Sequence, residues 1–254
     1  MNKVAQIRTN ESEALYRARV DLAALHRIAW QWGWSEAVVN HMTFMAPGFR
    51  DAFLLIPYGL HWSEVRASDF MIVNFKGAVL CGEGRTEVSA LALHGPIHRR
   101  VPHARCVLHT HQPNVSSLTA LSDQTLLMAH QDAILFHGAV AYLDAYDDLP
   151  LDASAGELCA DAIGEKLVLL MKNHGPLVVG ETIQTAFQTL YYLDRVVNVQ
   201  MRAVSTGRPV QTIADDVARK HGAFFRQHYL TEEADMHFAA MKRLLDRRGE
   251  DYAR

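Results

Sequence analysis

The sequence is poor in cysteine, with three in 254 residues: Cys81, Cys106 and Cys159. Their wide separation argues against a disulfide framework and against a zinc site built from paired cysteines. Unpaired thiols are typical of a reducing compartment, so we expect a cytoplasmic protein. Any metal chemistry would use nitrogen and oxygen ligands rather than sulfur.

Long apolar runs and an excess of one charge are also missing. No segment reaches the roughly 20 apolar residues that a membrane-spanning helix needs, and residues 1–10 lack the apolar core of a secretory signal. Lys and Arg total 25 against 28 for Asp and Glu, a net charge of −3. This balance argues against a broad nucleic-acid surface and a polybasic membrane surface. The expected partner is a small-molecule substrate, with no nucleic acid and no membrane.

Three common functional motifs are absent from the chain. Gly82-Glu83-Gly84 lacks the Lys-Ser/Thr end of a phosphate loop, and no dinucleotide-binding fingerprint occurs elsewhere. No Gly-x-Ser-x-Gly elbow is present either. These absences argue against nucleotide cofactors and against a serine nucleophile.

Histidine, by contrast, is abundant, with 14 residues. His109 and His111 end an apolar segment, and residues i and i+2 of a strand face the same side, so both imidazoles could bind one metal ion. His174 lies between two apolar segments, next to Gly175, which permits a close approach of the backbone. Hydrogen-bonded structural histidines would give the same pattern. Three histidines at strand ends are also the ligand set of an open catalytic metal site.

The hydrophobic pattern predicts a mixed α/β protein. Clustered strands followed by interleaved helices favour a mostly antiparallel sheet covered by helices. We expect one domain over residues 1–207, with a helical extension over 208–254 packed on it. The predicted strands cover 42–45, 53–56, 71–74, 78–80, 106–109, 167–171 and 177–179, and the main helices begin at capping pairs Asn10/Glu13 and Ser154/Glu157 or cover 87–101 and 182–204.

Glu87, Leu91, His94 and His98 fall on one face of the predicted helix 87–101. Glu87 could therefore face the same site as His94, where a carboxylate beside a metal acts as a base or a fourth ligand. An acid in a first helical turn is equally explained by the helix dipole. His98 precedes two arginines, and we expect it to be solvated.

The remaining histidines and the tryptophans carry weaker signals. His130 and His137 form a second polar cluster after the apolar residues 126–128. Trp30, Trp32 and Trp34 alternate at the end of the predicted first helix, where we expect them to pack in the core.

Two spaced histidine motifs closely resemble those of the class II aldolase/adducin family. They are Val107-Leu108-His109-Thr110-His111 and Met171-Lys172-Asn173-His174-Gly175-Pro176, supported by Gly33-Trp34-Ser35-Glu36, residues 53–59, Ala67-Ser68-Asp69 and His94-x-x-x-His98. The resemblance covers residues 13–205. It implies a three-layer α/β/α sandwich with a central, mostly antiparallel sheet. It also implies a homotetramer with active sites near subunit interfaces.

The resemblance further implies a metal site. In the family's sugar-phosphate aldolases, the histidines matching His109, His111 and His174 bind zinc or a similar divalent ion, and such a set also accepts Mn²⁺, Fe²⁺ or Co²⁺. The metal stabilises an enediolate, and a glutamate acts as ligand and acid–base group. Here Ala90 stands at the glutamate's position, so Glu87, three residues earlier, is the candidate catalytic residue.

The family's phosphate-binding residues are changed as well. Its small-Gly-Asn loop is Val39-Asn40-His41 here, and its paired serines are Arg85-Thr86. The loss of these donors argues against a phosphorylated substrate. The candidate residues for binding an unphosphorylated or carboxylate-bearing substrate are His41, Arg85, His94 and His130.

Three functions remain open from the sequence. The first is a metal-dependent lyase, an aldolase or a decarboxylase, that works through a metal-stabilised enolate. The second is another metalloenzyme on the same scaffold, such as a dehydratase, an epimerase or an iron-dependent oxygenase. The third is a non-catalytic, adducin-like interaction module. The lyase is the preferred hypothesis because all three candidate ligands are present.

Overall fold

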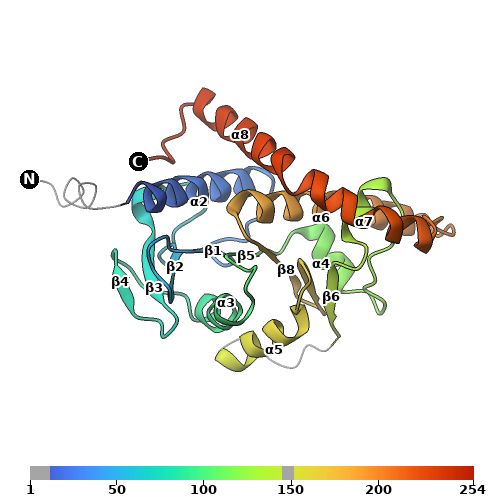
Figure 1. Ribbon diagram of the computed structural model, residues 1–254, viewed down its shortest axis with the longest axis horizontal. Coiled ribbons are helices and arrows are strands. Elements are labelled where there is room, and N and C mark those ends of the chain that lie inside the picture. The colour runs from blue at the N-terminus through green and yellow to red at the C-terminus, as the bar shows by residue number, and fades with distance from the viewer. Residues whose placement is uncertain (1–11, 145–151) are drawn as a thin grey trace, which may run out of the picture.

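The computed structural model of the chain describes residues 12–144 and 152–254 (Figure 1). Within these residues, eight strands form one sheet in the order β4-β3-β2-β1-β5-β8-β7-β6. Neighbouring strands are antiparallel except β6 and β7, so the predicted mostly antiparallel sheet is confirmed. The strands are β1 His41–Met45, β2 Ala52–Leu55, β3 Met71–Asn74, β4 Val79–Cys81, β5 Cys106–His109, β6 Val140–Leu143, β7 Val168–Met171 and β8 Gly175–Gly180.

The first half of the sheet is the predicted meander. β1, β2 and β3 are each paired antiparallel with the next strand along the chain. Their bounds differ from the predicted ones by at most one residue at either end. β6 was not predicted, and it joins the sheet as the parallel neighbour of β7.

Helices cover both faces of the sheet and make three layers (Figure 1). On one face, side chains of α2, α6 and α8 share a core with alternate strand residues such as Leu108 and Val178. On the other face, α3 and α5 share a core with Val107 and Val179. The α-helices of the described residues are α2 Glu13–Gln31, α3 Val88–Arg100, α4 Pro113–Thr119, α5 Ala153–Ile163, α6 Ile183–Val204, α7 Asp215–Tyr229 and α8 Glu232–Arg247, joined by 3-10 turns η1 Ala67–Asp69 and η2 Gln131–Phe136.

The alternation of side chains along the strands decides where the histidines lie. Successive residues of a strand point to opposite faces, so His109 shares the face of Val107, which α3 and α5 cover. His41 of β1 is the direct partner of His109 in β5. The two histidines therefore lie side by side at the ends of their strands, on the face of the sheet that α3 and α5 cover.

Two predicted helix starts are wrong. Asn10 lies outside the described residues, and Glu13 is the first residue of α2, which Ser12 caps by accepting a hydrogen bond from the amide of Leu15. Asp152, rather than Ser154, caps α5 through the amide of Ser154. Asparagine, aspartate and serine are all favoured N-caps, so the residue type alone does not decide which of them caps a helix. The residue that caps is the one directly before the first helical residue, here Ser12 and Asp152.

The last two helices, α7 and α8, pack mainly against other helical elements. α8 packs along α6, and α7 contacts η2. The chain then returns to the start of the fold, where the carboxylate of Asp251 lies 3.0 Å from the guanidinium of Arg27 and the carbonyl of Tyr252 accepts from the amide of Ala67. No helix among the described residues is both long enough and apolar enough to cross a membrane.

Candidate metal centre

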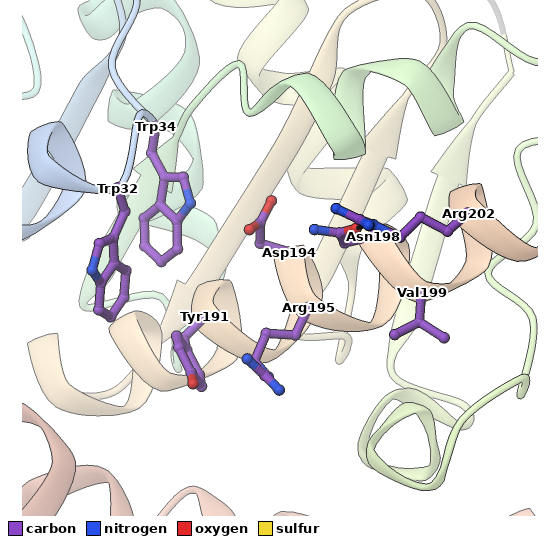
Figure 2. Close-up of a pocket in the computed structure, with 8 residues that line it drawn as sticks. All are labelled: Trp32, Trp34, Tyr191, Asp194, Arg195, Asn198, Val199 and Arg202. Carbon is purple, nitrogen blue, oxygen red and sulfur yellow. Dashed lines mark hydrogen bonds between the residues drawn. The ribbon is translucent and has the colours of Figure 1, made fainter.

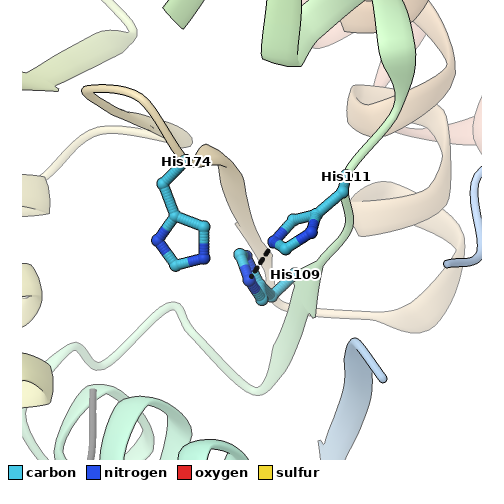
Figure 3. Close-up of side chains that lie close together, drawn as sticks. All are labelled: His109, His111 and His174. Carbon is cyan, nitrogen blue, oxygen red and sulfur yellow. Dashed lines mark hydrogen bonds between the residues drawn. The ribbon is translucent and has the colours of Figure 1, made fainter. Parts of the chain in front are cut away.

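Three histidines converge where β5 ends and β8 begins (Figure 3). His109 is the last residue of β5, His111 follows two residues later, and His174 lies in the turn between β7 and β8. One ring nitrogen from each lies within 4.8 Å of the others. The paired strands β5 and β8 bring the two sequence motifs together.

The turn that carries His174 depends on two special backbone positions. Asn173 has a φ of +54°, a conformation that asparagine tolerates better than most residues. A Cβ at Gly175 would lie 2.8 Å from the carbonyl oxygen of Thr110 and 3.2 Å from the ring of His111. The glycine therefore allows the two segments that carry the histidines to approach closely.

Hydrogen bonds fix which nitrogen of two histidines faces the cluster. Nδ1 of His109 donates to the carbonyl of Pro176 at 3.0 Å, and Nδ1 of His111 donates to the carboxylate of Glu36. Both acceptors lack a hydrogen, so each Nδ1 carries the ring proton and each Nε2 is left with a lone pair. This is the arrangement in which a metal-binding histidine is held by a carbonyl or a carboxylate behind it.

The two Nε2 atoms of His109 and His111 lie only 3.1 Å apart. A hydrogen bond between them would need one ring to be protonated, and burial lowers the pKa of His109 well below 6.5. Burial and the neighbouring His111 also lower the pKa of His174 to about 4. The Nε2 lone pair of His109 therefore faces the other two imidazoles of the triad. The donor set therefore fits a divalent metal ion with room for further ligands.

A second group of buried histidines lies beside the triad. The ring of His41 is 5.1 Å from that of His109, and its Nδ1 lies 2.8 Å from Nε2 of His94. Oγ1 of Thr43 lies 2.7 Å from both Nδ1 of His94 and Nε2 of His98. The prediction that His98 is solvated is wrong: its side chain is buried under β1, and Nδ1 donates to the carbonyl of Ala104 at 2.7 Å.

Glu87 does not lie on the helix face that the sequence suggested. It precedes α3, which begins at Val88, so its side chain does not follow the helical spacing to His94. Its carboxylate instead contacts Oγ of Ser89 at 2.7 Å, and that oxygen lies 3.3 Å from Nε2 of His41. Burial raises the pKa of Glu87. Glu87 is thus connected to the triad through Ser89 and His41.

The other two candidate substrate-binding residues lie elsewhere. Arg85 is exposed, and its guanidinium lies over the ring of Tyr58, 4.7 Å from the centroid. His130 caps η2 by accepting from the amide of Asp132. Within the described residues, these contacts are with Tyr58 and Asp132 and not with His109, His111 or His41.

Glu36 is a functional candidate that the sequence reasoning missed. It appeared there only inside the Gly33-Trp34-Ser35-Glu36 match, with no role. Its contact with His111 joins residues 75 positions apart, so no local pattern could have revealed it. An acid at the end of a Trp-rich loop was the available signal.

A pocket of about 430 Å³ adjoins the loop that carries Glu36 (Figure 2). Trp34 of this loop and Asn114 of α4 both donate to the carboxylate of Asp194 on α6. Core packing was expected for all three tryptophans: Trp34 is buried in the core, Trp32 is partly buried against it, and Trp30 is 42% exposed. Asp194 thus ties together the loop before Glu36 and the helix after His111.

The mostly antiparallel three-layer sandwich and the histidine triad define an α/β protein with a candidate divalent-metal centre. The family model of the Class II Aldolase and Adducin N-terminal domain matches residues 20–201, and the chain belongs to this family.

The relatives include both enzyme-named proteins and adducins. An aldolase class 2 family protein of Caulobacter vibrioides is 30% identical over 82% of this chain and 80% of its own length. Alpha-adducin of Rattus norvegicus is 32% identical over 79% of this chain. That match covers only 27% of the adducin, so the chain spans about a quarter of that relative.

Two solved structures share the fold over nearly the whole chain. An aldolase II superfamily protein from Pseudomonas syringae superposes with a TM-score of 0.91 at 29% identity, covering 98% of this chain and 100% of that one. The L-fuculose 1-phosphate aldolase from Glaciozyma antarctica superposes with a TM-score of 0.81 at 24% identity, covering 99% of each chain. At that identity the second likeness establishes the fold alone.

Proposed function

We propose that the chain is a divalent-metal-dependent lyase, of the aldehyde-lyase or carboxy-lyase type. Its substrate is a small hydroxy-carbonyl compound or carboxylate without a phosphate group. The observation that carries the proposal is the convergence of His109, His111 and His174. In His109 and His111, a hydrogen bond from Nδ1 orients the ring so that Nε2 faces the cluster. Zinc suits three imidazoles best, and Mn²⁺, Fe²⁺ or Co²⁺ are the other candidates.

When bound, such an ion supplies a Lewis acid with open positions, which polarises a substrate carbonyl. The remaining roles belong to backbone and side-chain groups of the chain itself. Pro176 and Glu36 orient the rings of His109 and His111. The burial of His109 excludes water from the back of the site. A pre-oriented ligand set of this kind does not have to reorganise when charge develops on the substrate.

Glu87 is the proposed acid–base group. Aldol cleavage needs a base for a hydroxyl proton, and both aldol cleavage and decarboxylation leave a carbanion that must receive a proton at carbon. Burial raises the pKa of Glu87, which favours the protonated form of the carboxyl group that this role needs. Ser89 and His41 connect Glu87 to the triad, so a proton can reach the site without bulk water.

The absence of a phosphate group from the substrate is supported by the place of Arg85. The guanidinium stacks on Tyr58 at the surface, where the family's sugar-phosphate aldolases are expected to carry serine donors. The buried ring of His41 occupies the other changed position. We also propose the family's homotetramer, with active sites near subunit interfaces.

A non-catalytic interaction module is the second candidate, favoured by the 32% identity to alpha-adducin. Elemental analysis of the purified chain separates the two. The lyase requires about one divalent ion per chain, lost in His109→Ala and kept in the matched control His103→Ala, whose ring contacts the carbonyl of Lys166. Less than a small fraction of an ion per chain would favour the module. A screen of hydroxy-ketones, keto acids and aromatic acids with the identified metal then tests for lyase activity, with His109→Ala as the control.

A further inference from the structure

Seven groups form one continuous chain of hydrogen bonds from the backbone to Glu87. It begins at the carbonyl of Ala104 and ends at the carboxyl group of Glu87. The links are Ala104 O to His98 Nδ1 at 2.7 Å, His98 Nε2 to Thr43 at 2.7 Å, Thr43 to His94 Nδ1 at 2.7 Å, His94 Nε2 to His41 Nδ1 at 2.8 Å, His41 Nε2 to Ser89 at 3.3 Å and Ser89 to Glu87 at 2.7 Å.

The first link determines the direction of the next ones. A carbonyl oxygen can only accept, so Nδ1 of His98 carries a hydrogen. His98 is buried, and burial lowers its pKa to about 4, so its ring is neutral and Nε2 has none. The hydroxyl of Thr43 must therefore donate to His98. Because a threonine hydroxyl has a single hydrogen, its oxygen accepts from Nδ1 of His94.

The same assignment of hydrogens extends to His94 and His41. With its hydrogen on Nδ1 and its side chain fully buried, the neutral ring of His94 offers only a lone pair at Nε2. Nδ1 of His41 must donate to that lone pair. Nε2 of His41 is then left with a lone pair, and it faces the hydroxyl of Ser89.

At its Glu87 end, this series of hydrogen bonds needs one hydrogen more than Ser89 can supply. Ser89 owns a single hydroxyl hydrogen, but an ionised Glu87 and the lone pair of His41 would both require it. One further proton, on the carboxyl group of Glu87, satisfies every link: Glu87 donates to the oxygen of Ser89, and the serine's own hydrogen is donated to Nε2 of His41.

We propose that Thr43 and His98 are positioning residues that set the direction of this chain. They hold His41 so that the lone pair of Nε2 faces Ser89, which directs the hydroxyl hydrogen of Ser89 toward His41 and leaves the oxygen of Ser89 to accept the acid proton of Glu87. The use of that proton in catalysis rests on the proposed lyase function. The direction of the hydrogen bonds does not, because it follows from the carbonyl of Ala104.

The test reads the ring hydrogens directly. Full-length protein labelled with ¹⁵N-histidine is studied by magic-angle-spinning NMR, as purified and again after chelation, with signals assigned by single His→Gln variants. His98, His94 and His41 are expected to carry a hydrogen on Nδ1 in both samples. A wild-type protein with the hydrogen of His94 on Nε2 would overturn the proposal, whatever the protein's activity.

The variants Thr43→Val and Thr43→Ser form a matched pair. Valine removes the hydroxyl at nearly the same volume, so His94 loses its acceptor and His94 and His41 should move their hydrogens to Nε2. Serine keeps the hydroxyl and should keep the wild-type pattern, and it should restore any turnover that valine lowers. An unchanged pattern in a folded Thr43→Val would contradict the role of Thr43. If the valine variant does not fold, the wild-type spectrum still decides the direction.

Discussion

The carboxylate of Glu36 accepts a hydrogen bond from Nδ1 of His111, across 75 residues of sequence. This contact leaves Nε2 of His111 to face His109 and His174. A carboxylate behind a ligating histidine fixes the tautomer and the ring orientation and makes the ring a stronger ligand. The affinity of the site for metal should therefore depend on a residue that would not touch the ion.

We expect Glu36→Ala to weaken metal binding by about 10- to 100-fold. Glu36→Gln, whose amide oxygen can still accept from Nδ1, should weaken it less. Competition with a chromophoric chelator measures the affinity of each variant. Glu181→Gln, an exposed acid after β8, is the control and should bind as wild type. An Ala variant with wild-type affinity would show that His111 needs no support from Glu36.

Gly175→Ala should damage the centre through sterics alone. The added Cβ would lie 2.8 Å from the carbonyl oxygen of Thr110, a backbone atom that cannot move without shifting the His111 segment. We expect a loss of about 1–3 kcal/mol in the free energy of unfolding, together with weaker metal binding. Gly95→Ala, within α3, is the matched control, because the atom nearest to its added Cβ would be the carbonyl oxygen of Phe75 at 3.9 Å. Equal stability of the two variants in urea unfolding would contradict the predicted close contact.

The triad could be predicted from the sequence because its signals are local. His109 and His111 stand at i and i+2 at the end of a strand, and His174 lies between two apolar segments. Strand ends bring such residues together whenever the strands pair. Local patterns also gave the meander and a long helix over 182–204, which is α6 in the structure with Thr182 as its N-cap.

The contacts behind the triad could not be predicted, because each depends on pairing across the fold. His98 precedes two arginines and has the local pattern of a solvated residue, but Thr43 on β1 covers it. Glu87 fits the helical spacing on paper, but the helix begins one residue later. Only the register of β1 against β5, which pairs His41 with His109, joins the two histidine groups.

Asp194 should influence the centre from α6. Its carboxylate holds the indole of Trp34 and the amide of Asn114, one in the loop before Glu36 and the other just after His111. We expect Asp194→Ala to shift the tryptophan fluorescence and to weaken metal binding, by less than Glu36→Ala does. Asp216→Ala, an exposed acid in the first turn of α7, is the control. Unchanged fluorescence and affinity would mean that the loop holds its place without Asp194.

Stability should fall in acid because of His26. The side chain is fully buried between Trp62 and Phe70, and this burial lowers its pKa from 6.5 to about 4. Between these two pH values the unfolded chain binds a proton that the folded chain does not. The free energy of unfolding therefore falls as the pH falls from 6.5 toward 4, by up to about 1.4 kcal/mol per pH unit for this group.

Replacing His26 with Phe should remove that share of the pH dependence. Urea unfolding between pH 4.5 and 7.5 would show a shallower loss of stability in His26→Phe than in wild type. His228→Gln changes an exposed histidine of α7 and is the control. If His26→Phe lost stability in acid as steeply as wild type, the buried ring would not be the source of the slope.

Glu87→Gln should separate catalysis from metal binding. The carboxyl of Glu87 contacts Ser89 rather than a triad histidine, so the variant should keep the metal content of wild type. Glutamine can accept from Ser89 but cannot hold or release an acid proton. We therefore expect turnover of the substrate found by screening to fall by about 10²- to 10⁴-fold, in kcat rather than in KM. Ser89→Ala, which breaks the link to His41, should lower turnover in the same way without removing the carboxyl. Wild-type turnover in Glu87→Gln would reject Glu87 as the acid–base group, while loss of the metal in this variant would make Glu87 a ligand instead.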